Sequence, residues 1–190
     1  RCAGMPDVSS IDPAFFDRSR VETFLETGGG TIHAAPINMA HRDLDLPDMF
    51  PGPGWTPLAR GPVVDDDAHG WVEASFLHEH EGAYYLFVNW GSCCAGVRST
   101  YEIRVGRSDS PLGPFTDRDG KAMLDGYGTL VLDSAGIMRG PGHASVRAGA
   151  DDDILSFHYY DADRGGLPWL GEVGLTWDDG WPKAVPFAAD

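Results

Sequence analysis

Apolar and polar residues alternate in short runs along most of this chain, and turn residues separate the runs. In the second half, the alternation predicts strands at Glu73–His78, Tyr84–Trp90, Thr100–Arg107, Thr129–Leu132, His143–Ala148, Ile154–Tyr160 and Trp169–Thr176. Nearer the start, it predicts shorter strands at Ala14–Asp17, Val21–Glu26 and Thr31–Ile37. No helical period extends beyond about two turns. The pattern therefore indicates an all-β fold: a sandwich, a barrel or a propeller.

Residues 41–70 break this alternation. Prolines, glycines and acidic residues are concentrated there, and they oppose regular strand pairing. We therefore expect an irregular insertion within one domain that spans residues 1–190.

Composition limits the partners more than the fold. The 190 residues carry a net charge of −15, which disfavours nucleic acid and anionic membranes because both attract basic surfaces. No apolar run is long enough to span a bilayer. The chain begins at Arg1 without a signal-peptide pattern, so we expect a mature product or part of a longer protein.

Glu73 is the first residue that points to chemistry. It interrupts an apolar, strand-like run, and the tyrosine-rich run Tyr84–Trp90 follows closely. Aromatic rings stack on sugar faces, and a carboxyl group in a partly dehydrated site holds its proton more readily and can act as an acid. From the residues alone, however, a solvated glutamate on an edge strand is the better interpretation.

The cysteines indicate neither a disulfide framework nor a metal site. There are three, and Cys93 and Cys94 are adjacent. Adjacent cysteines rarely bridge to each other because the geometry is strained, and an odd count gives no framework. No CxxC-type ligand spacing occurs. We therefore expect small buried thiols.

An ordered series of short motifs resembles the arabinan endo-1,5-α-L-arabinosidases of glycoside hydrolase family 43. The series is dense from Trp71 to Pro182 and thin before it. Its members are Ile11-Asp12-Pro13, Val72-Glu73-Ala74, Tyr84–Val88, Cys93–Gly96, Ser99–Tyr101, Val105–Ser108, Gly113–Phe115, Gly140–His143, His158–Asp161 and Gly180–Pro182. Each motif is weak alone, and the shared order makes the resemblance specific.

The resemblance implies a five-bladed β-propeller in which each blade is a four-stranded antiparallel sheet. Blades of about 40–50 residues leave room here for about three, so the fold is expected to be an incomplete propeller without its first two blades. Such a propeller would expose open sides, through which self-association is expected.

The resemblance also implies inverting glycoside hydrolysis by three carboxylates. Glu73 matches the general acid, although Ser75 stands where the family commonly has proline. Asp12, before Pro13, matches the aspartate that orients the acid and tunes its pKa; from the residues alone, an Asp-Pro turn opener is the more ordinary interpretation. The general base has no counterpart here, and nothing in the motif around Asp7 supports that role.

Further site residues follow from the resemblance alone. His143, in Gly-Pro-Gly-His, matches a channel histidine that contacts a metal ion, generally calcium, whose other ligands are mostly waters. An imidazole is an unusual ligand for a cation that prefers oxygens. The substrate cleft is expected to include Asn89, Trp90, Cys93, Cys94 and Ser99. For Trp90, packing in a blade is an equally common use.

Two functions remain open at this stage. One is an endo-acting, extracellular hydrolase of α-1,5-linked L-arabinan or arabino-oligosaccharides, in which this chain carries the general-acid half of the site. The alternative is a non-catalytic carbohydrate-binding propeller fragment that lacks the base. Arabinofuranosidase and xylosidase specificities are not separated by the sequence.

Overall fold

A computed structural model describes the backbone of residues 10–18, 21–28, 30–37, 55–65, 68–149 and 152–186. Side chains are described within these ranges from residue 30 onward, residues 35–37 and 65 excepted. No helix among the described residues is long and apolar enough to cross a membrane.

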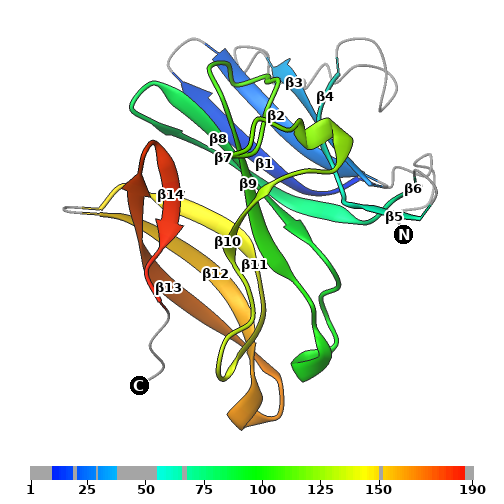
Figure 1. The fold of residues 1–190 in the computed structure, drawn as a ribbon, viewed down its shortest axis with the longest axis vertical. Coiled ribbons are helices and arrows are strands. Elements are labelled where there is room, and N and C mark those ends of the chain that lie inside the picture. Colours follow the sequence, from blue (N-terminus) through cyan, green and yellow to red (C-terminus); the bar gives the residue numbers. More distant parts are fainter. Residues whose placement is uncertain are drawn as a thin grey trace.

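Three four-stranded antiparallel sheets make up most of the fold (Figure 1). In each sheet the strands lie in sequence order, as in a propeller blade. The first sheet contains β1 (Ser10–Arg18), β2 (Val21–Gly28), β3 (Thr31–Ile37) and β4 (Thr56–Arg60). The second contains β7 (Val72–His80), β8 (Ala83–Trp90), β9 (Glu102–Ser108) and β10 (Thr129–Leu132). The third contains β11 (Met138–Arg147), β12 (Asp153–Asp161), β13 (Leu167–Asp178) and β14 (Trp181–Ala184).

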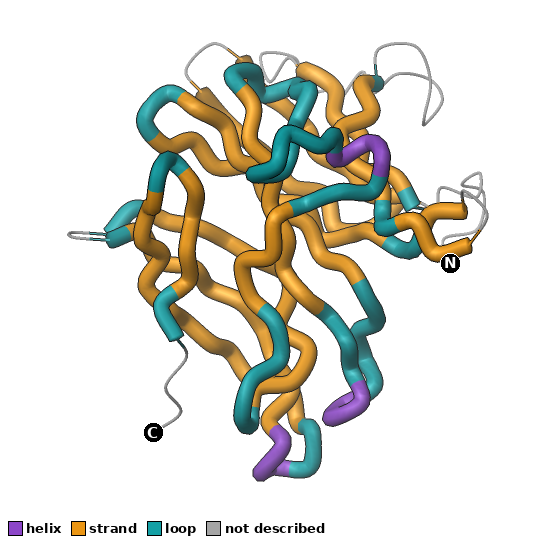
Figure 2. The backbone as a smooth tube through the Cα atoms, in the orientation of Figure 1, coloured by secondary structure: helices purple, strands orange, loops and turns teal. Residues whose placement is uncertain are grey.

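The remaining elements are small. A two-stranded sheet pairs β5 (Val63–Asp65) with β6 (Ala68–His69). Single-turn 3-10 helices occupy Gly96–Arg98, Met123–Asp125 and Ala162–Arg164, and the tube in Figure 2 is otherwise strand and loop. The expected all-β, incomplete propeller with about three blades is confirmed.

Two expectations about the elements are corrected. Residues 41–70 are not irregular throughout, because β4 lies among them and completes the first sheet by pairing with β3; residues 41–54 lie outside the described part. In addition, β11 begins five residues before the expected His143, so the Gly-Pro-Gly motif is strand rather than loop.

Strand β8 shows why the sheets stack. All eight of its residues are buried. Alternate side chains of a strand point to opposite faces, and here Tyr85 and Phe87 enter a core shared with the third sheet, while Leu86 and Val88 enter a core shared with the first. The second sheet is thus covered on both faces.

The first strand of each sheet lies beside the first strand of the next. β7 contacts both β1 and β11. These three strands carry Asp12, Glu73 and His143 respectively. The fold therefore gathers the three sequence-predicted motifs on neighbouring innermost strands.

Candidate active site

Glu73 is a buried carboxyl group near the start of β7. Its side chain is 7% exposed, and its Oε2 accepts a hydrogen bond of 2.8 Å from Nε1 of Trp71, whose own side chain is 49% exposed. Trp71 directly precedes β7, and residues two apart in extended backbone share a face, so these two side chains meet. β7 is an edge strand of its sheet, but Glu73 is buried there, so the interpretation of Glu73 as a solvated residue is wrong.

A β-bulge follows Glu73 and sets the direction of its side chain. Pairing with β8 shifts register between Glu73 and Phe76, and Ala74 adopts a left-handed φ of 51°. Val72 and Leu77 both enter the core shared with the first sheet although they are five positions apart, which strict alternation would forbid. The extra residue of the bulge resolves this conflict.

Asn89 lies directly opposite Glu73 in the β7–β8 pair and is fully buried. Its Nδ2 donates to the carbonyl oxygens of Glu102, at 3.0 Å, and Pro141, at 3.4 Å. Its Oδ1 accepts from the backbone N–H of His143 at 2.8 Å. This one amide therefore joins the strand opposite the acid to the Gly-Pro-Gly-His segment of the next blade.

The glycines of that segment are required by close packing. A Cβ on Gly142 would overlap Cδ2 of Tyr101 and lie 2.8 Å from Nδ2 of Asn89. A Cβ on Gly140, whose φ is +54°, would lie 2.6 Å from Cβ of Ser99. The two glycines let β11 approach the second blade closely at the level of the site.

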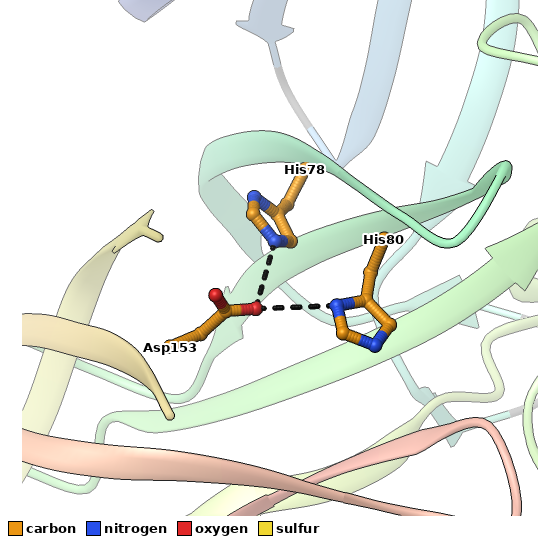
Figure 3. Close-up of side chains that lie close together, drawn as sticks. All are labelled: His78, His80 and Asp153. Carbon is orange, nitrogen blue, oxygen red and sulfur yellow. Dashed lines mark hydrogen bonds and ion pairs between the residues drawn. The ribbon is translucent and has the colours of Figure 1, made fainter. Parts of the chain in front are cut away.

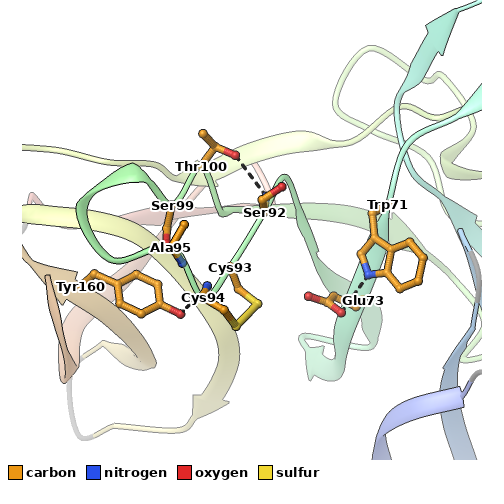
Figure 4. Close-up of a disulfide and its surroundings, with 9 residues drawn as sticks. All are labelled: Trp71, Glu73, Ser92, Cys93, Cys94, Ala95, Ser99, Thr100 and Tyr160. Atoms are coloured by element: carbon orange, nitrogen blue, oxygen red, sulfur yellow. Dashed lines mark hydrogen bonds between the residues drawn. A yellow bond between two sulfur atoms is a disulfide. The ribbon is translucent and has the colours of Figure 1, made fainter.

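Cys93 and Cys94 form a disulfide, which corrects the expectation of buried free thiols. Cys94 is exposed and Cys93 is half-buried. The loop that carries them is held from outside by the Tyr160 hydroxyl, which accepts from the Cys94 N–H at 2.8 Å (Figure 4). Within the loop, the Ala95 N–H donates to Oγ of Ser99 at 3.0 Å. Elementary geometry disfavours a bridge between neighbours, and only the folded loop shows that it forms.

The surroundings of this disulfide include Glu73 and Trp71 (Figure 4). The loop belongs to the second blade, but its anchor Tyr160 is on β12 of the third. An exposed, covalently stiffened loop thus stands beside the buried acid, consistent with the expected placement of Cys93 and Cys94 in a cleft. Their contact with substrate remains a prediction.

Two other expected substrate residues have structural partners. Ser99 is 4% exposed and is used in the loop bond described above. Trp90 is 7% exposed, packs in the core shared with the first sheet, and has the Arg104 guanidinium 4.9 Å from its ring centroid. Substrate contact by Ser99, Trp90 and Asn89 stays a prediction, and Trp71 offers the more accessible ring.

His143 is exposed and has a φ of 58°, stabilised by the bond from its N–H to Asn89. Among the described residues, no cluster of three or more histidine, cysteine or acidic side chains includes it. A single imidazole does not fit the oxygen-rich ligand set that Ca²⁺ prefers. No chemical step is therefore assigned to calcium, and calcium binding at His143 remains a prediction.

His158 lies close behind His143. It pairs across the β11–β12 ladder with Gly142 and lies 6.0 Å, centroid to centroid, from the ring of Tyr101. Burial, with a smaller contribution from the charge of His143, lowers the pKa of His158. This neighbourhood favours a neutral imidazole at His158.

Asp12 lies on β1, which contacts β7, but its side chain is outside the described part. Asp7 lies outside it altogether. The role expected for Asp12 therefore stays a prediction that the strand arrangement allows.

Sequence reasoning missed Trp71 and Tyr160 as site residues. The signal for Trp71 was its position two residues before Glu73 in a strand-like run. No local signal identified Tyr160, because its partner Cys94 is 66 residues away.

Comparison with known proteins places these features in a family. The extracellular endo-α-(1→5)-L-arabinanase 1 of Bacillus subtilis is 43% identical over 114 residues, which are 60% of this chain and 34% of that protein. The extracellular exo-α-(1→5)-L-arabinofuranosidase ArbA of Cellvibrio japonicus is 37% identical over 129 residues, which are 66% of this chain and 37% of that protein. The matches thus span about a third of the length of these relatives.

Solved structures agree on the fold and reach further along the chain. The α-L-arabinanase of Cellvibrio cellulosa in complex with arabinohexaose matches with a TM-score of 0.75 and 29% identity, over 91% of this chain and 56% of that one. The family 43 endo-arabinanase of Bacillus licheniformis matches with a TM-score of 0.75 and 33% identity, over 93% and 58%. The family model of glycosyl hydrolases family 43 matches residues 3–182. The chain therefore belongs to glycosyl hydrolase family 43.

Proposed function

We propose that this chain carries the general-acid half of the active site of an inverting hydrolase of α-1,5-linked L-arabinan. The observation that supports the proposal most is the environment of Glu73: a carboxyl group that is 7% exposed, on an innermost strand, bonded to a half-exposed tryptophan. The family and the names of its relatives supply the substrate class.

In the proposed reaction, Glu73 donates its proton to the glycosidic oxygen as the bond from that oxygen to the anomeric carbon breaks. A water molecule attacks the anomeric carbon from the opposite face, and a base takes the proton of that water. Inverting enzymes hold the acid and base carboxyl groups about 6.5–9.5 Å apart to admit the water. No motif of this sequence matches the base, so we propose that additional blades supply it.

The geometry supports this division of roles. The hydrogen bond from Trp71 fixes Oε2 of Glu73, so we assign the transferred proton to Oε1. The exposed ring of Trp71 provides an apolar surface beside the acid on which a sugar face can stack. Asn89 contributes by holding the backbone of His143 in place rather than by chemistry.

The proposal is tested with a reducing-sugar assay on linear arabinan. The chain alone should show little turnover, and addition of the two N-terminal blades of a family 43 relative should restore it. Since a general acid contributes about 10²–10⁴ in rate, Glu73→Gln should lower the restored kcat by that factor. The matched control is Glu81→Gln, at an exposed hairpin position of the same blade. If the chain alone turns over arabinan and Glu73→Gln retains that turnover, Glu73 is not the general acid.

The alternative is a carbohydrate-binding propeller without catalysis, which the missing counterpart of the base favours. Titration calorimetry with arabinohexaose separates the two. Binding that weakens about 10-fold in Trp71→Ala, as expected for loss of an aromatic stack of ~1.5 kcal/mol, without turnover after complementation, would support the alternative. Binding and turnover together support the hydrolase.

We further propose that the protein acts outside the cell, because both relatives described above are named extracellular. Calcium at His143 is a separate proposal, tested by Ca²⁺ titration of the protein and of His143→Ala. Equal heats for the two proteins would exclude His143 as a ligand.

A further inference from the structure

A second cluster of chemically active side chains lies outside the candidate active site. His78 and His80 are near the end of β7, and Asp153 is the first residue of β12 (Figure 3). Oδ2 of Asp153 lies 3.3 Å from Nε2 of His78 and 3.4 Å from Nδ1 of His80. All three ligand atoms lie within 4.8 Å of one another.

The cluster lies between the second and third blades. His78 and His80 are two positions apart on a strand, so their side chains share a face. That face is the one that Phe76 uses to pack on the core shared with the third sheet. Asp153, the first residue of β12, meets this face. The carboxylate therefore comes from one blade and both imidazoles from the other.

Trp177, on β13, supports the ligands from behind. Its Nε1 donates to Oδ2 of Asp153 at 3.0 Å, and its ring stacks on that of His80 with centroids 3.7 Å apart and an interplanar angle of 10°. Side-chain exposures of 14% for His78, 24% for His80 and 12% for Asp153 leave the cluster partly accessible to solvent. Ligands oriented by such outer contacts are typical of metal sites.

We propose that His78, His80 and Asp153 form a binding site for a divalent transition metal of the Zn²⁺ class. The ligand atoms would be Nε2 of His78, Nδ1 of His80 and Oδ2 of Asp153, with water at a fourth position. Two imidazoles and a carboxylate suit Zn²⁺ and its neighbours, whereas Ca²⁺ and Mg²⁺ select oxygens.

The distances between these groups also fit an ion placed between them, although the shorter of the two is a long hydrogen bond here. Charge-assisted N–H···O bonds are about 2.7–2.9 Å long, and both N···O distances here are longer, at 3.3 and 3.4 Å. Ligands about 2.0–2.1 Å from a tetrahedral Zn²⁺ lie roughly 3.3–3.4 Å from each other. The two histidine–aspartate separations are therefore compatible with a tetrahedral ion, and the third pair lies within 4.8 Å.

The site is distinct from the active site and has a structural role. The β8 partners of Glu73 and His78, Asn89 and Tyr85, are four positions apart, which at about 3.3 Å each places His78 roughly 13 Å from Glu73. Because the ligands come from two blades, the bound ion would tie the second sheet to the third.

The test uses the full 190-residue protein after dialysis against a chelator. Zn²⁺ titrated into it should bind with a stoichiometry of one, by calorimetry and by elemental analysis. At about a hundred-fold excess over Kd, the Tm should rise by roughly 5–10 °C. Ca²⁺ and Mg²⁺ should give no shift. Co²⁺ should give the visible absorption of a tetrahedral site, which Zn²⁺ should abolish.

Two variants assign the ligands. His80→Gln and Asp153→Asn should each weaken Zn²⁺ binding by about 100-fold or more, since even outer contacts contribute 10–100-fold. His69→Gln, which removes a histidine from β6 outside the cluster, is the control and should bind as the parent does. The Co²⁺ spectrum of the unmodified protein gives an answer even if a variant fails to fold. No stoichiometric Zn²⁺ binding by the parent, or binding unchanged in both ligand variants, would overturn the proposal.

Discussion

At the scale of single residues, Asn89 organises the candidate site. It faces Glu73 across the β7–β8 pair, and its three hydrogen bonds reach Glu102, Pro141 and His143. None of these partners is close to it in sequence. A buried amide with all its bonds satisfied fixes one arrangement of the groups around it, because any other arrangement leaves polar atoms unpaired.

Replacement of Asn89 by alanine should destabilise the protein by about 2–4 kcal/mol. The variant would lose hydrogen bonds worth about 1 kcal/mol each and would leave the His143 N–H without its acceptor, at a further 1–3 kcal/mol. Urea unfolding measures the change. Asn89→Asp keeps the acceptor for His143, but it turns an oxygen toward the carbonyls of Glu102 and Pro141 and buries a charge opposite Glu73, so it should cost at least as much as Asn89→Ala. If Asn89→Ala lowers the free energy of unfolding by less than about 0.5 kcal/mol, as an ordinary surface substitution does, this account is contradicted.

His158 gives a prediction for pH. Burial lowers the pKa of its imidazole, and the charge of His143 adds to the effect. A histidine whose pKa is lower in the folded state contributes stability that is complete above the unfolded value of about 6.5 and is lost as pH falls through the folded value. The Tm should therefore fall as pH drops below about 6.5.

The measurement is thermal unfolding between pH 8 and 5, together with NMR titration of the His158 ring. His158→Gln should flatten the dependence of Tm on pH. An imidazole of His158 that titrates at or above 6.5 would refute the prediction.

At the scale of elements, β11 departs most from its sequence pattern. The sequence predicts that this strand starts at His143, yet it starts at Met138 and has register shifts on both sides of Gly142. Tyr101 and Asn89 of the second blade fill the space that a side chain at Gly142 would need. The strand can therefore lie here because Gly142 has no side chain to clash with the neighbouring blade.

Gly142→Ala should cost about 2–3 kcal/mol, because an added methyl group in a tightly packed place forces the backbone or its neighbours to move. The matched control is Gly120→Ala, at a turn where an added Cβ meets nothing within 4 Å but φ is +81°. That control should cost only about 1 kcal/mol of backbone strain. Urea unfolding measures the loss of stability in both variants. Equal losses would mean that packing against Tyr101 does not require glycine at position 142.

At the scale of the whole molecule, the middle sheet is covered on both faces, while the third is covered on one face among the described residues. Leu170, on β13, pairs with His158 and is 71% exposed, on the face away from the shared core. Large exposed apolar side chains on a sheet face favour association.

We therefore expect the isolated chain to self-associate at micromolar concentration. Leu170→Glu should reduce that association, since it places a charge on the same face. Light scattering coupled to gel filtration measures the molar mass of both. A parent chain that stays monomeric, with a sharp thermal transition, would contradict the expectation.

The sequence by itself determined the class of fold and the residue that we propose as the acid. Alternation of apolar and polar residues is local, so it identified strands in all three sheets, although it missed β4 and β14. The Val-Glu-Ala and Gly-Pro-Gly-His motifs are local as well, so they could be matched to the family without coordinates.

The tertiary structure alone decided the rest, because each remaining feature joins residues distant along the chain. The clearest cases are the hydrogen bonds of Asn89 to β11, of Cys94 to Tyr160 and of Trp177 to Asp153. The disulfide of Cys93 with Cys94 belongs with them: the pair is adjacent in sequence, but the bridge stands in a loop that the next blade holds in place. Local patterns determine which residues can form strands; which side chains meet depends on the packing of one sheet against the next.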